Sequence, residues 1–253
     1  MALIHANFFS TTIAKNVGLY AVVPEGKPGP FPVLYLLHGL SDDYTIWLRR
    51  TRIEAFLREL PMIVVMPDGY RGFYTDNAEG PAYGKYMTDE IRTFVENTLP
   101  ASKKREHRAI GGLSMGGYGA LRCALERPDL YVSAHSHSGA TRDFAREVEW
   151  MKGAEIRRIF GSNPVGTHHD IYHLAEKAKK HKPLVKLRID CGTEDFLLKA
   201  NREFHTHLKK IKYPHEYIEN PGMHEWDYWE IHIQKALVFH AKIMGLPIPN
   251  YLK

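Results

Sequence analysis

Residues 33–37 and 62–66 form two short runs in which every side chain is hydrophobic. The first run is followed by His38-Gly39 and the second by Pro67-Asp68. Such runs are typical of strands that are buried on both faces, as in a mostly parallel sheet covered by helices. We therefore expect both segments to lie in the interior of such a sheet.

Helical patterns alternate with further short strands along the rest of the chain. Strand candidates are residues 108–113, 134–139, 185–191 and 216–219, and helix candidates are residues 46–60, 116–127 and a last segment from about Trp226. Thr88 is placed to cap another helix, whose first turn holds Asp89 and Glu90. Repeated strand–helix units predict a doubly wound α/β sheet, and residues 8–12 and 18–23 predict an antiparallel hairpin at its N-terminal edge.

Residues 141–182 are a long stretch of charged, helix-forming sequence between two strand candidates. We expect this stretch to be a helical excursion over the carboxyl edge of the sheet and not a separate domain, so that residues 1–253 form a single domain. Ligands bind at that edge in open α/β sheets. The excursion is therefore expected to cover and shape a pocket.

Composition argues against several other classes of protein. The chain has 253 residues, of which 44% are hydrophobic and 25% charged, and these fractions argue against intrinsic disorder. The net charge of +5 comes from scattered basic residues, so nucleic acid is not an expected partner. The two cysteines, Cys123 and Cys191, are too few for a disulfide framework and suit a reducing compartment.

Residues 1–7 show neither the basic start nor the apolar core of a signal peptide. No hydrophobic run approaches the roughly 18 residues of a membrane span. We therefore expect a soluble, cytoplasmic protein that does not bind a membrane.

Residues 112–116 read Gly-Leu-Ser-Met-Gly and lie between a strand candidate and a helix candidate. A G-x-S-x-G pattern at a strand–turn–helix is a nucleophile elbow, which holds the serine hydroxyl above the edge of the sheet. Gly112 and Gly116 fit this turn because a side chain at either position would collide where strand and helix pass closely. The alternative is a glycine-rich turn in which Ser114 only caps the helix. The residues downstream favour the nucleophile.

A serine nucleophile needs a histidine base and a carboxylate that orients the base. After a nucleophile elbow these partners follow in the order serine, acid, histidine. Asp195 and His224 both lie at strand-to-helix connections, at the sheet edge expected for Ser114. Asp190 and Glu194 are the alternatives for the acid. We favour Asp195, because Asp190 lies within the strand, where it would brace the loop, and Glu194 is expected to point outward.

Acyl transfer also requires donors for the tetrahedral oxyanion, typically two backbone N–H groups. One belongs to the residue after the nucleophile, here Met115, and the other to the loop after an early strand. Leu40 occupies that loop position, directly after Gly39. We predict Leu40 and Met115 as the oxyanion hole, and Trp47 and Trp226 as aromatic residues of the core or of the pocket wall.

Two His-x-His pairs raise the question of a metal site. His135 and His137 lie on a strand candidate and face one side of it, but no nearby cysteine or carboxylate completes a site. His205 and His207 lie on a helix candidate, where side chains two residues apart diverge. We expect all four to be packing or surface residues, and we expect neither a metal nor an organic cofactor.

Four motifs together resemble the esterase D family of α/β hydrolases. They are Leu-Leu-His-Gly-Leu at 36–40, Gly-Leu-Ser-Met-Gly-Gly-Tyr-Gly-Ala at 112–120, Cys-Gly-Thr-Glu-Asp at 191–195 and Gly-Met-His-Glu-Trp at 222–226. Residues 73–77 and 86–90 also match that family. The resemblance covers nearly the whole chain, and it implies an α/β-hydrolase fold with Ser114, Asp195 and His224 as the catalytic residues.

Within the family, the short length and the lack of a secretion signal look most like the small tributyrin-type carboxylesterases. That resemblance implies a homo-oligomer, either a dimer or a tetramer, that hydrolyses small short-chain acyl esters without a cofactor. S-formylglutathione hydrolases are similar, but they usually carry a cysteine in the loop after His-Gly, where residues 40–44 read Leu-Ser-Asp-Asp-Tyr. A thioesterase of that kind is the alternative, as are acetyl-xylan and feruloyl esterases.

Overall fold

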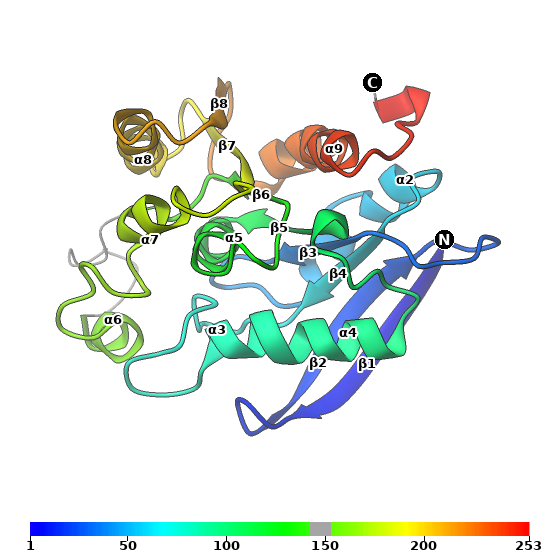
Figure 1. Cartoon of the computed structure of the whole chain (residues 1–253), viewed down its shortest axis with the longest axis horizontal. Coiled ribbons are helices and arrows are strands. Elements are labelled where there is room, and N and C mark those ends of the chain that lie inside the picture. The colour runs from blue at the N-terminus through cyan, green and yellow to red at the C-terminus, as the bar shows by residue number, and fades with distance from the viewer. Residues whose placement is uncertain (142–152, 253) are drawn as a thin grey trace.

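The computed structural model describes residues 1–141 and 153–252, and eight strands within these ranges form one mixed sheet. The strands are β1 (Ala2–Ser10), β2 (Lys15–Val23), β3 (Val33–Leu37), β4 (Ile63–Pro67), β5 (Arg108–Leu113), β6 (Ser133–His137), β7 (Lys186–Gly192) and β8 (His215–Asn220). Their order across the sheet is β1-β2-β4-β3-β5-β6-β7-β8 (Figure 1). From β4 to β8 all neighbours are parallel, whereas β2 pairs antiparallel with both β1 and β4. The doubly wound sheet and its N-terminal hairpin are confirmed.

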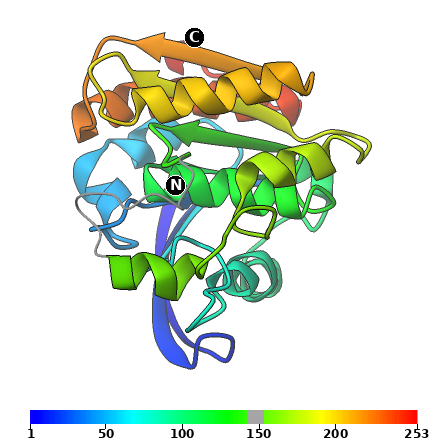
Figure 2. The same ribbon diagram turned by 90° about the vertical axis from the view of Figure 1, so that its left-hand side faces the viewer.

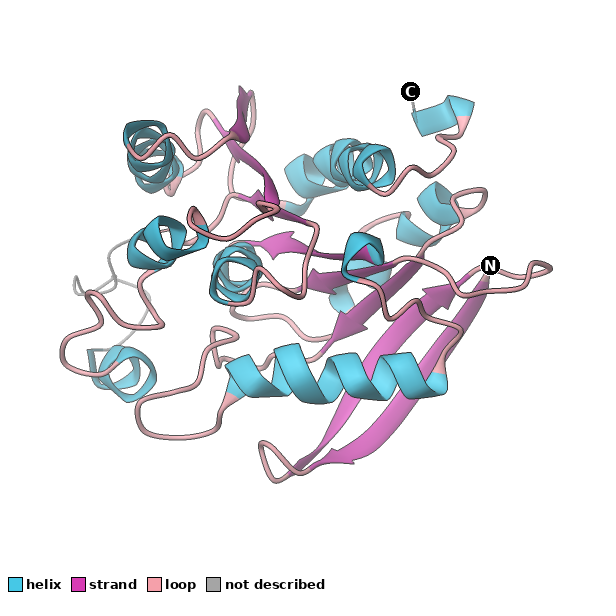
Figure 3. Cartoon of the chain, in the orientation of Figure 1, coloured by secondary structure: helices cyan, strands magenta, loops and turns pink. Residues whose placement is uncertain are grey.

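Helices cover both faces of this sheet (Figure 3). On one face lie α1 (Ile46–Arg50), α2 (Ile53–Leu57) and α9 (Trp226–Ile243). On the other lie α3 (Tyr83–Lys85), α4 (Arg92–Thr98), α5 (Met115–Glu126), α6 (Gly153–Phe160), α7 (Ile171–Ala178) and α8 (Leu198–Lys210). The remaining short helical segments of the described ranges are a π-helical turn (Tyr86–Ile91) and two 3-10 turns (Arg105–His107 and Asn250–Leu252).

The continuous hydrophobic runs are buried on both faces, as predicted. In β3, Tyr35 and Leu37 belong to the core under α4, α5, α7 and α8, whereas Leu34 and Leu36 belong to the core under α1, α2 and α9. Successive side chains of a strand point to opposite faces. A strand between two helical layers therefore needs a hydrophobic residue at every position.

The prediction of one continuous helix over residues 46–60 is wrong, because the structure has two short helices there, α1 and α2. Thr51 separates them with an extended backbone, φ −138° and ψ 164°. Its hydroxyl donates a hydrogen bond to the carbonyl of Trp47 at 2.5 Å, and so satisfies an acceptor at the end of α1. The amide of Thr51 donates to the same carbonyl at 3.2 Å, and the chain leaves the helix at this residue.

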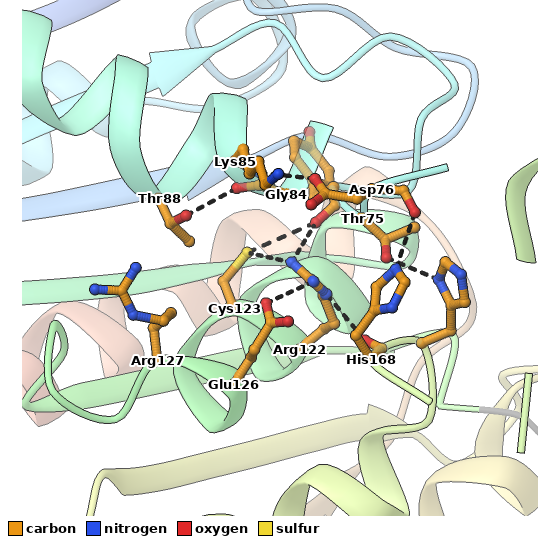
Figure 4. A network of polar contacts seen from close by, with 12 residues as sticks. Thr75, Asp76, Gly84, Lys85, Thr88, Arg122, Cys123, Glu126, Arg127 and His168 are labelled. Carbon is orange, nitrogen blue, oxygen red and sulfur yellow. Dashed lines mark hydrogen bonds and ion pairs between the residues drawn. The ribbon is translucent and has the colours of Figure 1, made fainter. Parts of the chain in front are cut away.

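The prediction that Thr88 caps a helix is also wrong. The helical segment already begins at Tyr83, and Thr88 lies inside it, with its hydroxyl donating to the carbonyl of Gly84 at 3.0 Å (Figure 4). The first turn is held from elsewhere in the chain, because Asp76 accepts a hydrogen bond from the amide of Lys85 at 2.8 Å. A partner that lies outside the helix leaves no signal in the local pattern.

Residues 142–152 of the predicted excursion lie outside the described residues. In the part that is described, α7 packs between α5 and α8 in the helical layer (Figure 2). The end of α6 is joined to the loop after β4, since the amides of Ala78 and Glu79 donate to the carbonyls of Ile159 and Arg158 at 2.9 and 2.8 Å. The excursion thus supplies elements on the same face as α5. In these same ranges of the chain, no helix has both the length and the apolar character to cross a membrane.

Candidate active site

Ser114 lies at the turn between β5 and α5, and its residue surface is 9% exposed. Its backbone has φ 52° and ψ −117°, in the region that favours glycine. Its amide donates to the carbonyl of His137 at 2.9 Å, and its carbonyl accepts from the amides of Tyr118 and Ala140 at 3.0 Å each. These bonds fix the turn to α5 and to the chain at the end of β6.

Two glycines allow β5 and α5 to approach the end of β3. A Cβ built on Gly116 would lie 2.6 Å from the carbonyl oxygens of both Leu37 and His38. A Cβ on Gly112 would lie 2.6 Å from the carbonyl oxygen of Leu37 and 2.8 Å from that of Gly116. Because these contacts are to backbone atoms, a larger residue would require the turn itself to move.

The structure brings Ser114, His224 and Asp195 together from the ends of three parallel strands. Nε2 of His224 lies 3.0 Å from Oγ of Ser114, and Nδ1 of His224 lies 2.8 Å from Oδ2 of Asp195. Burial acts to raise the pKa of Asp195, but hydrogen bonds from His224, Ser138 and the amide of Leu197 outweigh burial, so that this pKa lies below its usual value. Asp195 is therefore held as a carboxylate against the imidazole.

The two alternative acids have other partners. Asp190 is fully buried in β7, where it accepts hydrogen bonds from Nδ1 of His137 at 2.8 Å and from the hydroxyl of Tyr228 at 3.1 Å. Glu194 points outward, as predicted, and its carboxylate accepts the amide of Gly222 at 2.7 Å. Glu194 therefore fixes the loop that carries His224, through the amide of Gly222. The prediction that Asp190 braces the loop is wrong, because Asp190 contacts His137 and Tyr228 instead.

The loop that carries Leu40 runs beside the serine. A Cβ built on Gly39 would lie 3.9 Å from Cβ of Ser114. His38 fixes this loop, since its Nδ1–H donates to the carbonyl of Gly39 at 2.7 Å and its Nε2 accepts a backbone amide of the loop after β4 at 2.9 Å. Met115 is the first residue of α5, where an amide has no acceptor within the helix. Leu40 and Met115 thus lie at the same edge of the sheet as Ser114.

Aromatic rings surround the histidine. The ring of Trp229 packs edge-on to His224 at 4.9 Å, and Phe196, which is 55% exposed, lies 4.5 Å from the same imidazole. Trp226 is half-buried and packs edge-on against both Trp229 and Trp47, at 5.2 Å each. Trp47 is 1% exposed and belongs to the core. Of the two predicted tryptophans, the structure thus places Trp47 in the core, behind Trp226.

Ser138 is a residue of this site that the sequence analysis missed. It follows β6 with φ 47°, is fully buried, and hydrogen-bonds Asp195. Its Oγ also accepts a hydrogen bond from Nε1 of Trp229 at 3.3 Å. The one signal for Ser138 in the sequence is its place at the carboxyl end of a predicted strand.

Arg122 joins α5 to two loops on its face of the sheet (Figure 4). It is 1% exposed, and its guanidinium donates to the carbonyl of His168 at 3.1 Å and to that of Tyr74 at 3.4 Å. It also pairs with Glu126, one turn further along α5, at 2.5 Å. The helix that begins beside Ser114 is thereby tied to the loop after β4 and to the segment that precedes α7.

The His-x-His pairs serve packing and hydrogen bonding. His135 meets His240 at 2.7 Å between ring nitrogens, within the buried layer between β6 and α9. His205 and His207 diverge, as predicted, since His205 contacts His215 and His207 contacts the carbonyl of Tyr172. In the described part of the chain, no group of three or more His, Cys, Asp or Glu side chains is arranged to hold a metal ion.

A mostly parallel eight-stranded sheet in this order, with helices on both faces, is the α/β-hydrolase fold. The structure is similar to a substrate-bound serine hydrolase from Staphylococcus aureus, the fluorophosphonate-binding hydrolase FphF, with a TM-score of 0.88 and 34% identity over 94% of this chain and 98% of that one. It is also similar to the S-formylglutathione hydrolase FrmB of Staphylococcus aureus, with a TM-score of 0.86 and 34% identity over the same shares of the two chains.

The sequence comparisons agree. A family model described as "Putative esterase" matches residues 10–240. An acetyl esterase from Caldicellulosiruptor saccharolyticus is 33% identical over 96% of this chain and 99% of its own length. The chain belongs to the esterase family that includes the esterase D-like enzymes, and it is a carboxylic ester hydrolase.

Proposed function

We propose that this esterase hydrolyses short-chain acyl esters with Ser114 as the nucleophile, His224 as the general base and Asp195 as the acid that orients the base. The observation that carries this proposal is the pair of contacts made by the two nitrogens of His224, 3.0 Å to the hydroxyl of Ser114 and 2.8 Å to the carboxylate of Asp195. One imidazole that bridges a hydroxyl and a buried carboxylate is the geometry that activates a serine.

In the first half-reaction, Oγ of Ser114 bonds to the acyl carbon while Nε2 of His224 takes its proton. Asp195 holds Nδ1–H, so that Nε2 is free to accept, and it stabilises the imidazolium that forms. The amides of Leu40 and Met115 donate to the oxyanion. His224 then returns the proton to the departing alcohol, which leaves the acyl group on Ser114.

In the second half-reaction, His224 takes a proton from water as the water oxygen attacks the acyl-enzyme. The tetrahedral intermediate collapses to release the carboxylic acid, and Ser114 regains its proton from His224. The same donors serve both steps. Trp226 is proposed as part of the wall of the acyl pocket, supported from behind by Trp47, which it contacts edge-on at 5.2 Å.

The similarity to an acetyl esterase over nearly the full length of both chains supports a short acyl group. The similarity to an S-formylglutathione hydrolase at 34% identity supports the second candidate, a thioesterase that uses the same three residues. The absence of cysteine from residues 40–44 argues for the first of these two candidates. An acetyl-xylan or feruloyl esterase is the third candidate.

Initial rates on 4-nitrophenyl esters from acetate to octanoate, with S-formylglutathione and methyl ferulate alongside, test the proposal. We expect a maximum between acetate and butyrate, and a loss of several orders of magnitude in kcat for Ser114→Ala with an unchanged unfolding transition. Labelling by a fluorophosphonate probe should disappear in the same variant. Turnover by Ser114→Ala at the wild-type rate would refute the assignment, and a strong preference for S-formylglutathione would establish the thioesterase.

Three further expectations stay predictions from the sequence. A single domain over residues 1–253 predicts one cooperative unfolding transition. The homo-oligomer, dimer or tetramer, is tested by sedimentation, and the cytoplasmic location by cell fractionation.

A further inference from the structure

A groove of about 580 Å³ begins at the loop that carries the proposed oxyanion donor. Leu40 and Ser41 line this groove, together with residues of the loop after β4 and of α6. The same loop passes Ser114 at Gly39, as the 3.9 Å separation of Cβ positions shows. The groove therefore shares Leu40 with the proposed oxyanion hole, although neither Ser114 nor His224 lines it.

The groove is lined by three cationic side chains that come from separate parts of the chain. Lys15 begins β2, Arg71 lies in the loop after β4, and Arg158 lies on α6. Asp42 is the one carboxylate among the described lining residues, and it lies at the end near Leu40, where its Oδ2 is 3.0 Å from the Cβ position of Gly39. The other charged side chains that line the groove are thus all cationic.

Among the residues that the structure describes, one of the three cations forms an ion pair with a carboxylate. Arg71 makes a two-point ion pair with Glu155 of α6, at 2.7 and 2.8 Å. Within residues 1–141 and 153–252, neither Lys15 nor Arg158 forms an ion pair. In the described residues, Lys15 and Arg158 therefore have no carboxylate at ion-pair distance, while Arg158 together with Arg71 lowers the pKa of Glu155. The pair of Arg71 and Glu155 holds α6 against the opposite wall.

Lys15 is also held in place. Its ammonium group lies 4.0 Å from the centre of the ring of Tyr70, another lining residue, in a cation–π contact. Tyr83 and Ser41 add hydroxyl groups to the wall. A fixed ammonium, a guanidinium and neutral hydroxyl donors form a set of groups that suits a carboxylate or a phosphate.

We propose that this groove is a subsite for an anionic group, a carboxylate or a phosphate, carried by the ester substrate at a distance from the scissile bond. The proposal rests on the proposed function and narrows its substrate class to anionic esters. The anion contacts Lys15 and Arg158, while the ester carbonyl lies at Ser114. The anionic group belongs either to the acyl chain or to the alcohol of the ester. In both cases the same two cations, Lys15 and Arg158, would contact it.

The test compares two matched pairs of esters. For the acyl chain, mono-4-nitrophenyl adipate is compared with its methyl ester, and for the alcohol, 3-acetoxybenzoate is compared with methyl 3-acetoxybenzoate. Each pair differs by one negative charge. We expect kcat/KM of wild type to favour the anionic member of one pair by tenfold or more, mainly through KM, and this preference to shrink at high ionic strength.

The variant Lys15→Met/Arg158→Gln removes both of these cations, and Arg157→Gln, an exposed neighbour on α6 that does not line the groove, is its control. We expect the double variant to lose the preference and to keep the wild-type rate on the neutral esters. Equal rates on both members of both pairs, or a double variant that behaves like Arg157→Gln, would overturn the subsite. Hydrolysis of the neutral esters in that case leaves the proposed function standing, whereas a wild type inactive on all four esters would refute that function.

Discussion

The carboxylate of Asp190 accepts hydrogen bonds from Nδ1 of His137 at 2.8 and 2.9 Å, so this acid is engaged by a histidine other than His224. Asp190 and Asp195 lie only a few residues apart at the end of β7, and each one forms a pair with a different imidazole. One pair reaches the serine and the other is fully buried. We therefore expect Asp195 to act in catalysis and Asp190 to stabilise the fold. Substitution of each acid can distinguish these two roles.

Asp195→Asn should lower kcat by about a thousandfold or more, because an amide stabilises neither the required tautomer nor the imidazolium of His224. Asp190→Asn should instead cost about 2 kcal/mol of unfolding free energy, because an amide cannot accept all the hydrogen bonds that the buried carboxylate takes from His137 and Tyr228. Urea unfolding and kcat per labelled active site measure the two effects separately. A large loss of kcat in a folded Asp190→Asn protein would contradict the assignment.

Gly116→Ala should lower kcat at least tenfold and destabilise the fold by about 2 kcal/mol, since its Cβ would lie 2.6 Å from the carbonyl oxygens of Leu37 and His38. Gly26→Ala is the control. Gly26 has φ 69° and open space around it, so its substitution should cost only about 1 kcal/mol and leave kcat unchanged. Equal behaviour of the two variants would show that close approach at Gly116 is not required.

Arg122→Met should reduce the unfolding free energy by about 3 kcal/mol, because it leaves the carbonyls of Tyr74 and His168 and the carboxylate of Glu126 without their donor. Arg127→Met, in which a half-exposed ion pair is lost, should change it by less than about 1 kcal/mol. Chemical denaturation of both variants gives the comparison. A difference below the experimental error would remove Arg122 from its anchoring role.

Stability should fall as the pH is lowered below about 6.5, because burial lowers the pKa of His240 to about 3 and lowers that of His135 well below its usual value. Both histidines stay neutral in the folded protein, whereas the unfolded chain binds protons below pH 6.5. Their stabilisation is complete above that pH and is lost progressively towards pH 3. For His240 the loss is about 2 kcal/mol between pH 6.5 and 5.

Urea unfolding at pH 7.5 and at pH 5 measures this dependence. His240→Gln should reduce the difference in unfolding free energy between the two pH values. A wild-type stability that is the same at both pH values would contradict the role assigned to the buried histidines.

The sequence predicted those features that depend on local periodicity and on spacing along the chain. The strands at 33–37 and 108–113 have the predicted bounds, and the loops that carry Ser114, Asp195 and His224 meet at one edge because parallel strands end there. Local pattern does not contain contacts that form only when distant segments meet. The capping of Lys85 by Asp76, the bonds of Arg122 to the carbonyls of two loops and the contact of Ser138 with Asp195 are all of that kind.

The backbone of Ser114, with φ 52° and ψ −117°, carries a consequence for how this enzyme can change. The residue that tolerates this conformation best is glycine, so Ser114→Gly should raise the melting temperature while it removes the nucleophile. At this position, selection for activity and selection for stability therefore oppose each other. A lineage that no longer needs hydrolysis would gain stability by losing its serine, so an inactive relative of this fold with glycine at the elbow is the expected product of relaxed selection.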